Sequence, residues 1–372
     1  MKLIKFKNLP EISIYLLGII FFIKATTLIN IGNTIENIII AIVSIILVIH
    51  IILSKYNLKS LLFCLLLSIL ALYTSLITEQ SSILEMVLLI IAVRNYDINR
   101  VIEIIYRLSK HLLLIHLIIY AVLLLWGQQE FFTLYYGRFR ASFGFIHPNL
   151  FSIYVFNIML MWAWLNYEKF NNKNLLVILL IMTLVYMVTN TRTAYIINIF
   201  ILLTLYLSKK GKYPGAIFTG SLFPIISLLM LLFSKLYYDG NNIILTINEL
   251  LSGRIKLGAY ALSNYGPTLL GQNIKFSDIT WDPKWGLNSF TFDSLYTYLL
   301  FCIGIVWLLI IIVLIYKVSK KSEKSRIFIL AFVLYSITEI HPLNCFYLFP
   351  ILLFSTIGTK TNKNKPHKRN NP

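Results

Sequence analysis

The chain has 372 residues, of which 58% are hydrophobic and only 13% are charged. A soluble domain is about half apolar and a quarter charged, so this composition excludes an ordinary soluble fold. The net charge of +18 would favour nucleic acid as the partner of a soluble protein, but in a membrane protein the placement of the charges matters more than their sum.

Apolar runs long enough, or nearly long enough, to cross a bilayer recur along the whole chain. A helix needs about 20 mostly apolar residues to cross the hydrocarbon core. The runs that reach or approach this length are 12–31, 35–53, 59–78, 112–127, 150–165, 174–189, 193–207, 214–234, 294–316 and 326–340. Two shorter runs, 81–93 and 343–357, bring the prediction to about twelve helices in one all-α, polytopic membrane domain over residues 1–372.

Lysine and arginine favour one side of this predicted bundle. If the N-terminus is cytoplasmic, 24 of the 33 lysines and arginines lie in cytoplasmic connections or at the two termini. Cytoplasmic loops of membrane proteins carry such an excess, so the pattern predicts a multi-pass protein of the cytoplasmic membrane with both termini inside. The basic segment 360–372 is then a cytoplasmic tail, interpreted as a topology determinant.

Two connections on the predicted outward side are longer than the others, at 128–147 and at 235–291, between the ninth and tenth helices. Long loops are uncommon unless they are functional or disordered, and the second is too rich in aromatic residues for a disordered linker. We therefore expect it to form a cap or a substrate platform. On the inward side, residues 94–110 predict an amphipathic helix lying at the cytoplasmic surface.

Arginines on the outward side are candidates for anion binding because they run against the charge bias. Arg192, in TNTRTAY, lies between two apolar runs with almost no loop, where an unpaired charge is costly. Arg254, in LLSGRIKLGAY, follows a Ser-Gly pair suited to starting a short helix, whose first amides would face an anion. Two guanidinium groups suit a pyrophosphate. The plainer alternative is a short turn and a solvated loop charge.

A second outward group precedes the 150–165 run, in YYGRFRASFGFIHPNLF. Arg138 and Arg140 alternate with aromatic residues, which fits either an extended segment that receives a sugar or phosphate, or an interfacial aromatic belt. His147 and Asn149 flank Pro148 where the chain re-enters the membrane. They are candidates for substrate binding, and the alternative is that these residues simply start the helix.

Carboxylates on the same side are candidates for acid–base chemistry. Asp293 opens the tenth run in NSFTFDSLYTYLLFCIGI, either as a helix cap or as a general base that deprotonates an acceptor hydroxyl. Glu339 and His341, in TEIHPLNCFYL, are further candidates for substrate binding, with Asn344 nearby. Their alternative is a polar turn between the last two helices. The three cysteines have no metal-like spacing, so neither a zinc site nor a disulfide framework is expected. No cofactor is predicted.

In order, spacing and sidedness, these segments resemble the O-antigen and capsular polysaccharide polymerase family (Wzy-type), which is related to the O-antigen ligases. The resemblance spans most of the chain and rests on FGFIHPNLF, TNTRTAY, SGRIKLGAYAL with LLGQNI, DSLYTYLLFCIGI and EIHPLN. It implies a membrane glycosyltransferase in which Arg192 and Arg254 hold undecaprenyl pyrophosphate and the outward loops hold the glycan. Ligase relatives carry His followed by Asn where this chain has Asp293 and Ser294, which leaves the identity of the base open.

The resulting expectation is an enzyme that polymerises undecaprenyl-pyrophosphate-linked repeat units on the outer face of the cytoplasmic membrane. The anomeric carbon is already activated, so the enzyme must align the acceptor, remove its proton and stabilise the leaving group. Expected partners are the lipid-linked glycan donor and acceptor and membrane lipid, with a flippase and a chain-length regulator as further candidates and no nucleic acid. A lipid-linked oligosaccharide flippase and an O-antigen-type ligase are the alternatives.

Overall fold

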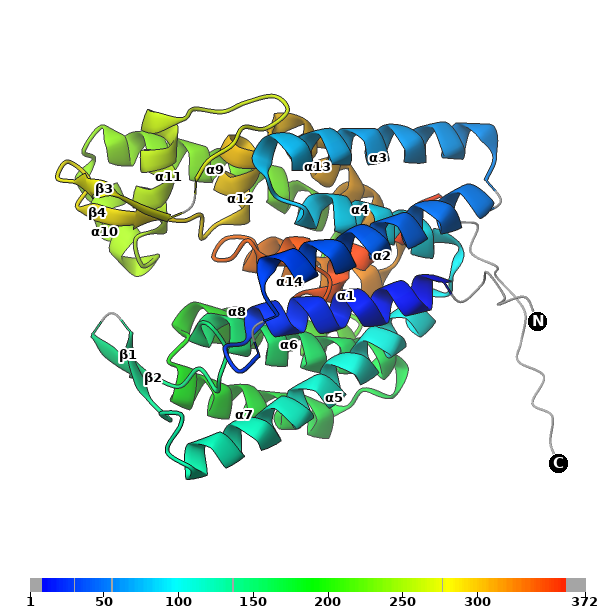
Figure 1. Cartoon of the computed structure of the whole chain (residues 1–372), viewed down its shortest axis with the longest axis horizontal. Coiled ribbons are helices and arrows are strands. Elements are labelled where there is room, and N and C mark those ends of the chain that lie inside the picture. Colours follow the sequence, from blue (N-terminus) through cyan, green and yellow to red (C-terminus); the bar gives the residue numbers. More distant parts are fainter. Residues whose placement is uncertain (1–8, 30, 55, 136, 276, 359–372) are drawn as a thin grey trace.

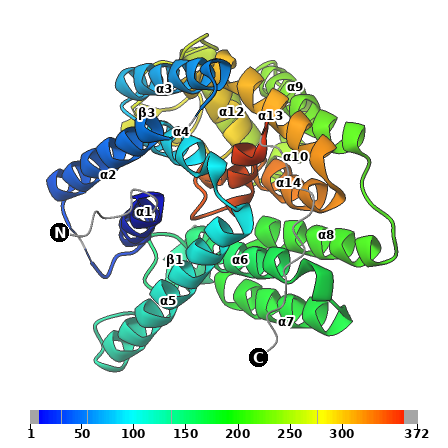
Figure 2. The same ribbon diagram turned by 90° about the vertical axis from the view of Figure 1, so that its right-hand side faces the viewer.

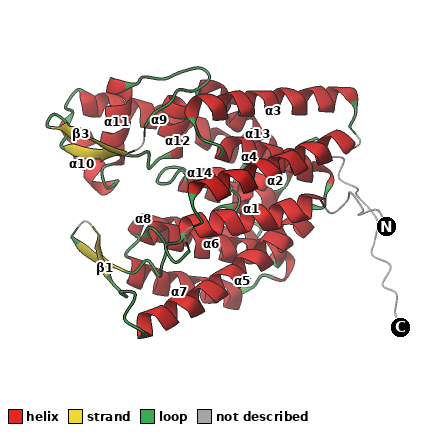
Figure 3. Cartoon of the chain, in the orientation of Figure 1, coloured by secondary structure: helices red, strands yellow, loops and turns green. Residues whose placement is uncertain are grey.

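The computed structural model describes residues 9–358 except 30, 55, 136 and 276, so the expected 360–372 tail lies outside the described residues. The described chain is mainly helical, with two small β-hairpins at one end of a helical bundle (Figures 1 and 3). The predicted all-α class is therefore confirmed.

The helices of the first half are α1 (Leu9–Ala25), α2 (Asn33–Leu53), α3 (Leu58–Thr78), α4 (Ser82–Ala92), α5 (Ile98–Leu125), α6 (Pro148–Leu165) and α7 (Asn172–Thr189). Those of the second half are α8 (Arg192–Lys209), α9 (Ala216–Tyr238), α10 (Asn242–Leu250), α11 (Arg254–Asn264), α12 (Leu295–Tyr298), α13 (Ile305–Lys321) and α14 (Glu323–Tyr335). Shorter helical segments are η2 (Val93–Asn95), η3 (Tyr167–Lys169), the π-helical η4 (Leu299–Ile303), η5 (His341–Leu343) and η6 (Phe349–Thr356).

Six helices of the described chain are long and apolar enough to cross a membrane: α2, α3, α5, α6, α7 and α9. Only 22% of the apolar window of α3 is buried inside the protein, whereas 72% of that of α6 is buried. Exposed leucine and isoleucine along the outer helices suit contact with lipid, and a helix that is apolar all round belongs in the interior. The chain is thus a helical membrane-type protein with α6 inside the bundle.

The other expected spans are shorter or interrupted, and in α8 the apolar part is the shorter segment Ala194–Lys209. Helix α1 has 17 residues, α4 has 11 and α14 has 13, while the 343–357 run contains the 3₁₀ helix η6. The 294–316 run is divided at Gly304 between η4 and α13. The described residues therefore contain six helices that meet the length criterion, and the total of twelve spans stays a prediction.

Helix α5 differs from the prediction, which placed a boundary between a surface helix and a membrane span near residue 111. The expected surface helix at 94–110 and the expected span at 112–127 form a single helix of 28 residues. Asp97 caps this helix by accepting a hydrogen bond from the Asn99 amide at 3.0 Å. No glycine or proline interrupts the sequence between residues 98 and 125, so nothing stops the helix between its polar and apolar halves.

Both long connections are folded. The 128–147 connection contains an antiparallel hairpin of β1 (Thr133–Tyr135) and β2 (Arg138–Arg140). The 235–291 connection contains the end of α9, then α10, α11 and a second hairpin of β3 (Ser277–Asp282) and β4 (Leu287–Phe290). Tyr260 packs against Trp285 and Phe290, with ring centroids 5.8 and 4.9 Å apart. This segment is therefore a small folded cap rather than an irregular loop.

The C-terminal segment passes through the middle of the bundle, where η6 (red) lies among the longer helices (Figure 2). Asn157 of α6 holds the start of this segment, because its side-chain amide donates to the carbonyls of Cys345 and Phe346 and its Oδ1 accepts from the Phe349 amide. Buried amides that satisfy backbone groups in this way fix the path of a non-helical chain. The turn before η6 is consequently fixed against α6.

Candidate functional site

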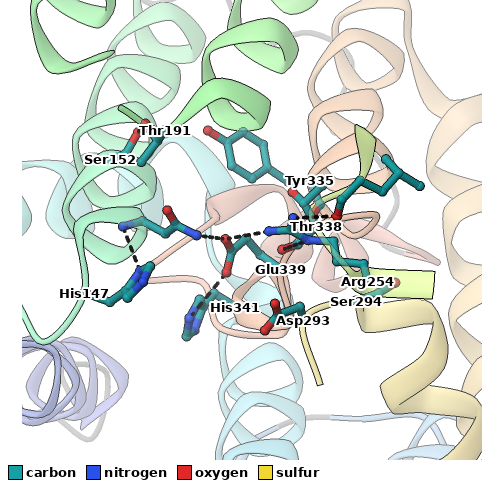
Figure 4. Close-up of polar contacts among 12 residues, drawn as sticks. His147, Ser152, Thr191, Arg254, Asp293, Ser294, Tyr335, Thr338, Glu339 and His341 are labelled. Carbon is teal, nitrogen blue, oxygen red and sulfur yellow. Dashed lines mark hydrogen bonds and ion pairs between the residues drawn. The ribbon is translucent and has the colours of Figure 1, made fainter. Parts of the chain in front are cut away.

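Polar side chains from four distant segments meet at the hairpin end of the bundle (Figure 4). These segments are 138–149, 251–254, 291–294 and 335–341. They belong respectively to β2 and the start of α6, the start of α11, the approach to α12, and the turn after α14. Most of the predicted site residues lie here.

Asn149 joins two parts of this cluster. Its Oδ1 accepts a hydrogen bond from Arg140 Nη2 at 2.7 Å, and its Nδ2 donates to Glu339 Oε1 at 3.0 Å. Arg140 Nε also donates to the Thr189 carbonyl at 2.7 Å, which ties β2 to the end of α7. Burial lowers the pKa of the Arg140 guanidinium, and the charge of Arg138 lowers it further. Arg140 is therefore fixed on one side of the site.

Glu339 occupies the centre of the cluster, beyond the end of α14, with 15% of its side chain exposed. Its Oε1 lies 4.0 Å from Arg254 Nη2, and its Oε2 lies 3.7 Å from His341 Nε2. Burial raises the pKa of the Glu339 carboxyl to about 8, and the positive charge of Arg254 opposes this rise. Burial, with the neighbouring His147, lowers the pKa of His341 to about 4. The His341 imidazole is therefore neutral near pH 7.

Arg254 approaches Glu339 from the first residue of α11, which confirms the predicted short helix. Gly253 precedes it in the left-handed region at φ +85°, a conformation that glycine adopts without strain. Only 8% of the Arg254 side chain is exposed, and Nε and Nη1 donate to the carbonyls of Thr338 and Leu251 at 3.2 and 3.0 Å. The guanidinium is directed into the cluster rather than into solvent.

Asp293 lies near Arg254 and Glu339 (Figure 4) and is half-buried. The N-cap of α12 is Ser294, and the Asp293 side chain accepts no backbone amide among the described residues, so the capping alternative is not observed. Its single hydrogen bond from a described residue is a long one, 3.4 Å from Thr291 Oγ1. Burial raises the pKa of Asp293 and the charge of Arg254 opposes this. Asp293 is thus less engaged than Glu339 and has an oxygen available for substrate.

His147 is the N-cap of α6. Its Nδ1 accepts the Asn149 amide at 3.1 Å, and Pro148 occupies the first turn. This hydrogen bond requires an unprotonated Nδ1, and burial together with the charges of Arg140 and Arg254 lowers the pKa of His147 to about 4. Helix α6 therefore starts at Pro148, as the alternative for this segment held, with His147 as its cap, and the ring presents its other nitrogen on a neutral imidazole.

Three predicted residues stand apart from this cluster. Arg192, the first residue of α8, is exposed, and its side chain has no hydrogen bond or ion pair with the residues that the structure describes. Arg138 is exposed on β2. Asn344 is buried and uses Oδ1 to accept the Phe346 amide, which makes it part of a turn. The arginine linked to Arg254 through Asn149 and Glu339 is Arg140, not Arg192.

Two features of the cluster were not predicted from the sequence, because little in the residue pattern pointed to them. The Tyr335 hydroxyl is buried and has no hydrogen-bond partner in the described part of the chain. Thr191 donates to Ser152 Oγ at 3.0 Å (Figure 4) and shares a hydrogen bond with the hydroxyl of Thr189, whose carbonyl accepts from Arg140. Tyr335 and Ser152 lie in apolar runs, where a hydroxyl does not stand out. The proximity of Thr191 to Arg192 in TNTRTAY was the one available indication.

No group of three or more His, Cys, Asp or Glu side chains in the described ranges is arranged to hold a metal ion. Comparison with known proteins adds no relative, because no family model, curated protein or solved structure matches this chain.

Proposed function

We propose that this protein is a membrane glycosyltransferase that polymerises undecaprenyl-pyrophosphate-linked oligosaccharide repeat units on the outer face of the cytoplasmic membrane. The observation that supports this most is the joining of Arg140, Asn149, Glu339 and Arg254, with Asp293 beside them, at one end of an apolar helical bundle. Guanidinium groups at the end of a membrane bundle suit a lipid diphosphate, and a nearby carboxylate suits removal of a proton from a sugar hydroxyl.

In this proposal an acceptor hydroxyl attacks the anomeric carbon of the donor glycan. The new glycosidic bond forms as the bond to the pyrophosphate oxygen breaks, the hydroxyl proton passes to Asp293, and undecaprenyl pyrophosphate leaves. Arg254 and Arg140 stabilise the charge that develops on the leaving group. Glu339 orients Arg254 and Asn149 rather than acting as the base, because both of its oxygens already face partners. Arg192 is assigned a contact with the diphosphate at the exposed edge.

We also propose that the shorter segments cross the membrane, giving about twelve spans with the site outside and both termini in the cytoplasm. Contacts between segment ends support this alternation. At the hairpin end, the Thr27 amide donates to the Gly144 carbonyl and the Ala141 amide to the Val188 carbonyl. At the other end, Lys209 donates to the Tyr167 carbonyl. Segment ends therefore meet at two opposite faces, as consecutive spans require.

The direct test uses purified protein in lipid vesicles supplied with lipid-linked repeat units. We expect the wild-type protein to yield a ladder of polymer and Asp293→Asn to lower its formation by about 10²-fold or more. Asp239→Asn is the matched control, because Asp239 is exposed at the end of α9 and lies outside the cluster. Full polymer formation by Asp293→Asn would remove Asp293 as the base.

The species that accumulate when the gene is deleted separate the three activities. Single repeat units displayed outside support the polymerase. Units trapped on the cytoplasmic side indicate a flippase, and long chains stranded on the carrier lipid indicate a ligase. Either of the last two results would replace the proposed function.

A further inference from the structure

An open groove of about 1000 Å³ lies between α9, α13 and the end of η6, far from the polar cluster along α13. Most of its lining is apolar, with Ile217, Pro224, Ile312 and Val313 along its length. Ile217 is 73% exposed and Val313 is 49% exposed, so both side chains are open to an occupant. A groove of this size is in the range that holds a small ligand or part of a lipid chain.

The floor of the groove is formed where α9 approaches α13 closely. A Cβ placed on Gly220 would lie 2.8 Å from the Tyr316 ring, so only glycine permits this approach without a shift. Pro224 lies inside α9 one turn later and removes the amide that would otherwise donate to the Gly220 carbonyl. Gly220 and Pro224 both line the groove, which is therefore shaped by the backbone as well as by side chains.

One end of the groove is strongly basic. Lys317, Lys320 and Lys321 line it in the last turns of α13, and all three are exposed. Lys321 Nζ donates to the Thr356 carbonyl at 2.5 Å, and Lys320 Nζ lies 4.3 Å from the centroid of the Tyr316 ring. None of the three forms an ion pair with a carboxylate of the described residues. The end of the groove thus presents three positive charges beside an apolar channel.

We propose that this groove binds an anionic glycerophospholipid, with its phosphate at the three lysines and an acyl chain along the apolar lining. Charge complementarity selects this occupant, because basic pockets between membrane helices attract anionic headgroups. The basic segment 360–372 would be repelled by the same lysines. The inference is independent of the proposed enzymatic function.

The test is native mass spectrometry of the full chain in detergent, titrated with phosphatidylglycerol and separately with phosphatidylcholine. We expect phosphatidylglycerol to bind at least about tenfold more tightly, and the triple variant Lys317→Gln, Lys320→Gln, Lys321→Gln to remove most of that preference. The matched control replaces Lys209, Lys210 and Lys212 by Gln, which are exposed lysines elsewhere on the chain that do not line the groove. The control triple should keep the preference.

A second pair of variants tests whether the apolar lining of the groove holds an acyl chain. Val313→Trp should fill the groove and weaken binding of phosphatidylglycerol, whereas Leu309→Trp, an exposed position outside the lining, should not. Glycerol phosphate, which lacks acyl chains, should fail to displace the lipid. The proposal is overturned if both lysine triples lose the preference equally, if the two lipids bind equally, or if Val313→Trp leaves lipid binding unchanged.

Discussion

At the scale of single residues, Glu339 and Arg254 form a buried pair in which the stability of each side chain depends on the other. Each is largely buried, at 15% and 8% exposure, and above pH 8, where the Glu339 carboxyl is ionised, each lies beside the other's opposite charge. Removing one member of a buried pair leaves an uncompensated charge, which costs about 3–5 kcal/mol, whereas removing both charges is often nearly neutral. The pair therefore has a structural role that any test of its catalytic role must separate.

A double-mutant cycle makes this separation. We expect Glu339→Gln and Arg254→Met each to lower thermal stability in detergent, and the double variant to be more stable than the sum of the two losses predicts. Thermal unfolding above pH 8, where both groups are charged, followed by tryptophan fluorescence, gives the four values. Strictly additive losses would show that the two side chains do not interact.

His147 provides a second prediction, because its ring caps α6. His147→Asn keeps an acceptor for the Asn149 amide, whereas His147→Ala removes it and should cost about 1 kcal/mol of stability. If capping is the whole role of His147, the Asn variant retains polymer formation. Loss of product by a stable Asn variant would instead show that the other ring nitrogen contacts substrate.

The dependence of stability on pH follows from the direction of three shifts. The pKa values of His147 and His341 fall from 6.5 to about 4 on folding, so the folded protein binds fewer protons in that window and loses stability as the pH decreases. The pKa of Glu339 rises from 4.5 to about 8, so its effect is opposite, and stability is lost as the pH rises towards 8. These three groups together favour a maximum near pH 6.5.

Melting temperatures measured between pH 8 and pH 4 test this, with His147→Asn as the comparison. The variant lacks one titrating imidazole, so it should lose less stability than the wild type between pH 6.5 and pH 4. If both proteins lost the same amount of stability between pH 6.5 and pH 4, the lowered pKa of His147 would be contradicted.

At the scale of elements, the interruption between α12 and α13 packs against the segment 266–272. The chain passes through the π-helix η4 to Gly304, which has φ +108° and ψ 151°. A neighbouring segment crosses here, since the amides of Ile305 and Val306 donate to the carbonyls of Thr268 and Leu269. Gln272, which belongs to the same crossing segment as Thr268 and Leu269, donates to the carbonyl of Gly266 and, across the contact, to that of Phe301 in η4. A break of this kind joins the cap to the membrane helices.

Gly304→Ala should be strongly destabilising for two reasons. Its backbone lies in a region that only glycine adopts easily, at a cost of about 1–3 kcal/mol, and its Cβ would lie 2.6 Å from Gly271 N and Leu269 O. Gly240→Ala is the control, because Gly240 also has positive φ, at +77°, but nothing lies within 4 Å of the added Cβ. Differential scanning fluorimetry should show a clearly larger loss for Gly304→Ala, and equal losses would argue against the close packing.

At the scale of the whole molecule, the proposed sidedness can be measured with thiol labelling. The native cysteines are all buried, so they give little background. Leu134→Cys, on the exposed hairpin, should react with a membrane-impermeant maleimide in intact cells. Lys210→Cys should react only after the membrane is permeabilised. Labelling of both positions from the same side would exclude the proposed topology.

Much of the site was predictable from residue types. Arg140, His147, Arg254, Asp293 and Glu339 were all singled out because charged and polar groups are rare in an apolar chain, and the structure brings them together. Sequence spacing, however, does not tell whether Arg140 or Arg192 lies closer to Arg254 in the folded chain. For that reason the expected pairing of Arg192 with Arg254 differs from the observed linkage through Arg140.

The sequence by itself determined the helical class and its apolar character, because burial in lipid requires long runs of hydrophobic residues and these are visible without a structure. Helix lengths, the fold of the cap and the break at Gly304 were decided by tertiary packing, since they depend on contacts between segments far apart in the chain. The same holds for the joining of Asn149 to Glu339, 190 residues apart, which gives the site its geometry.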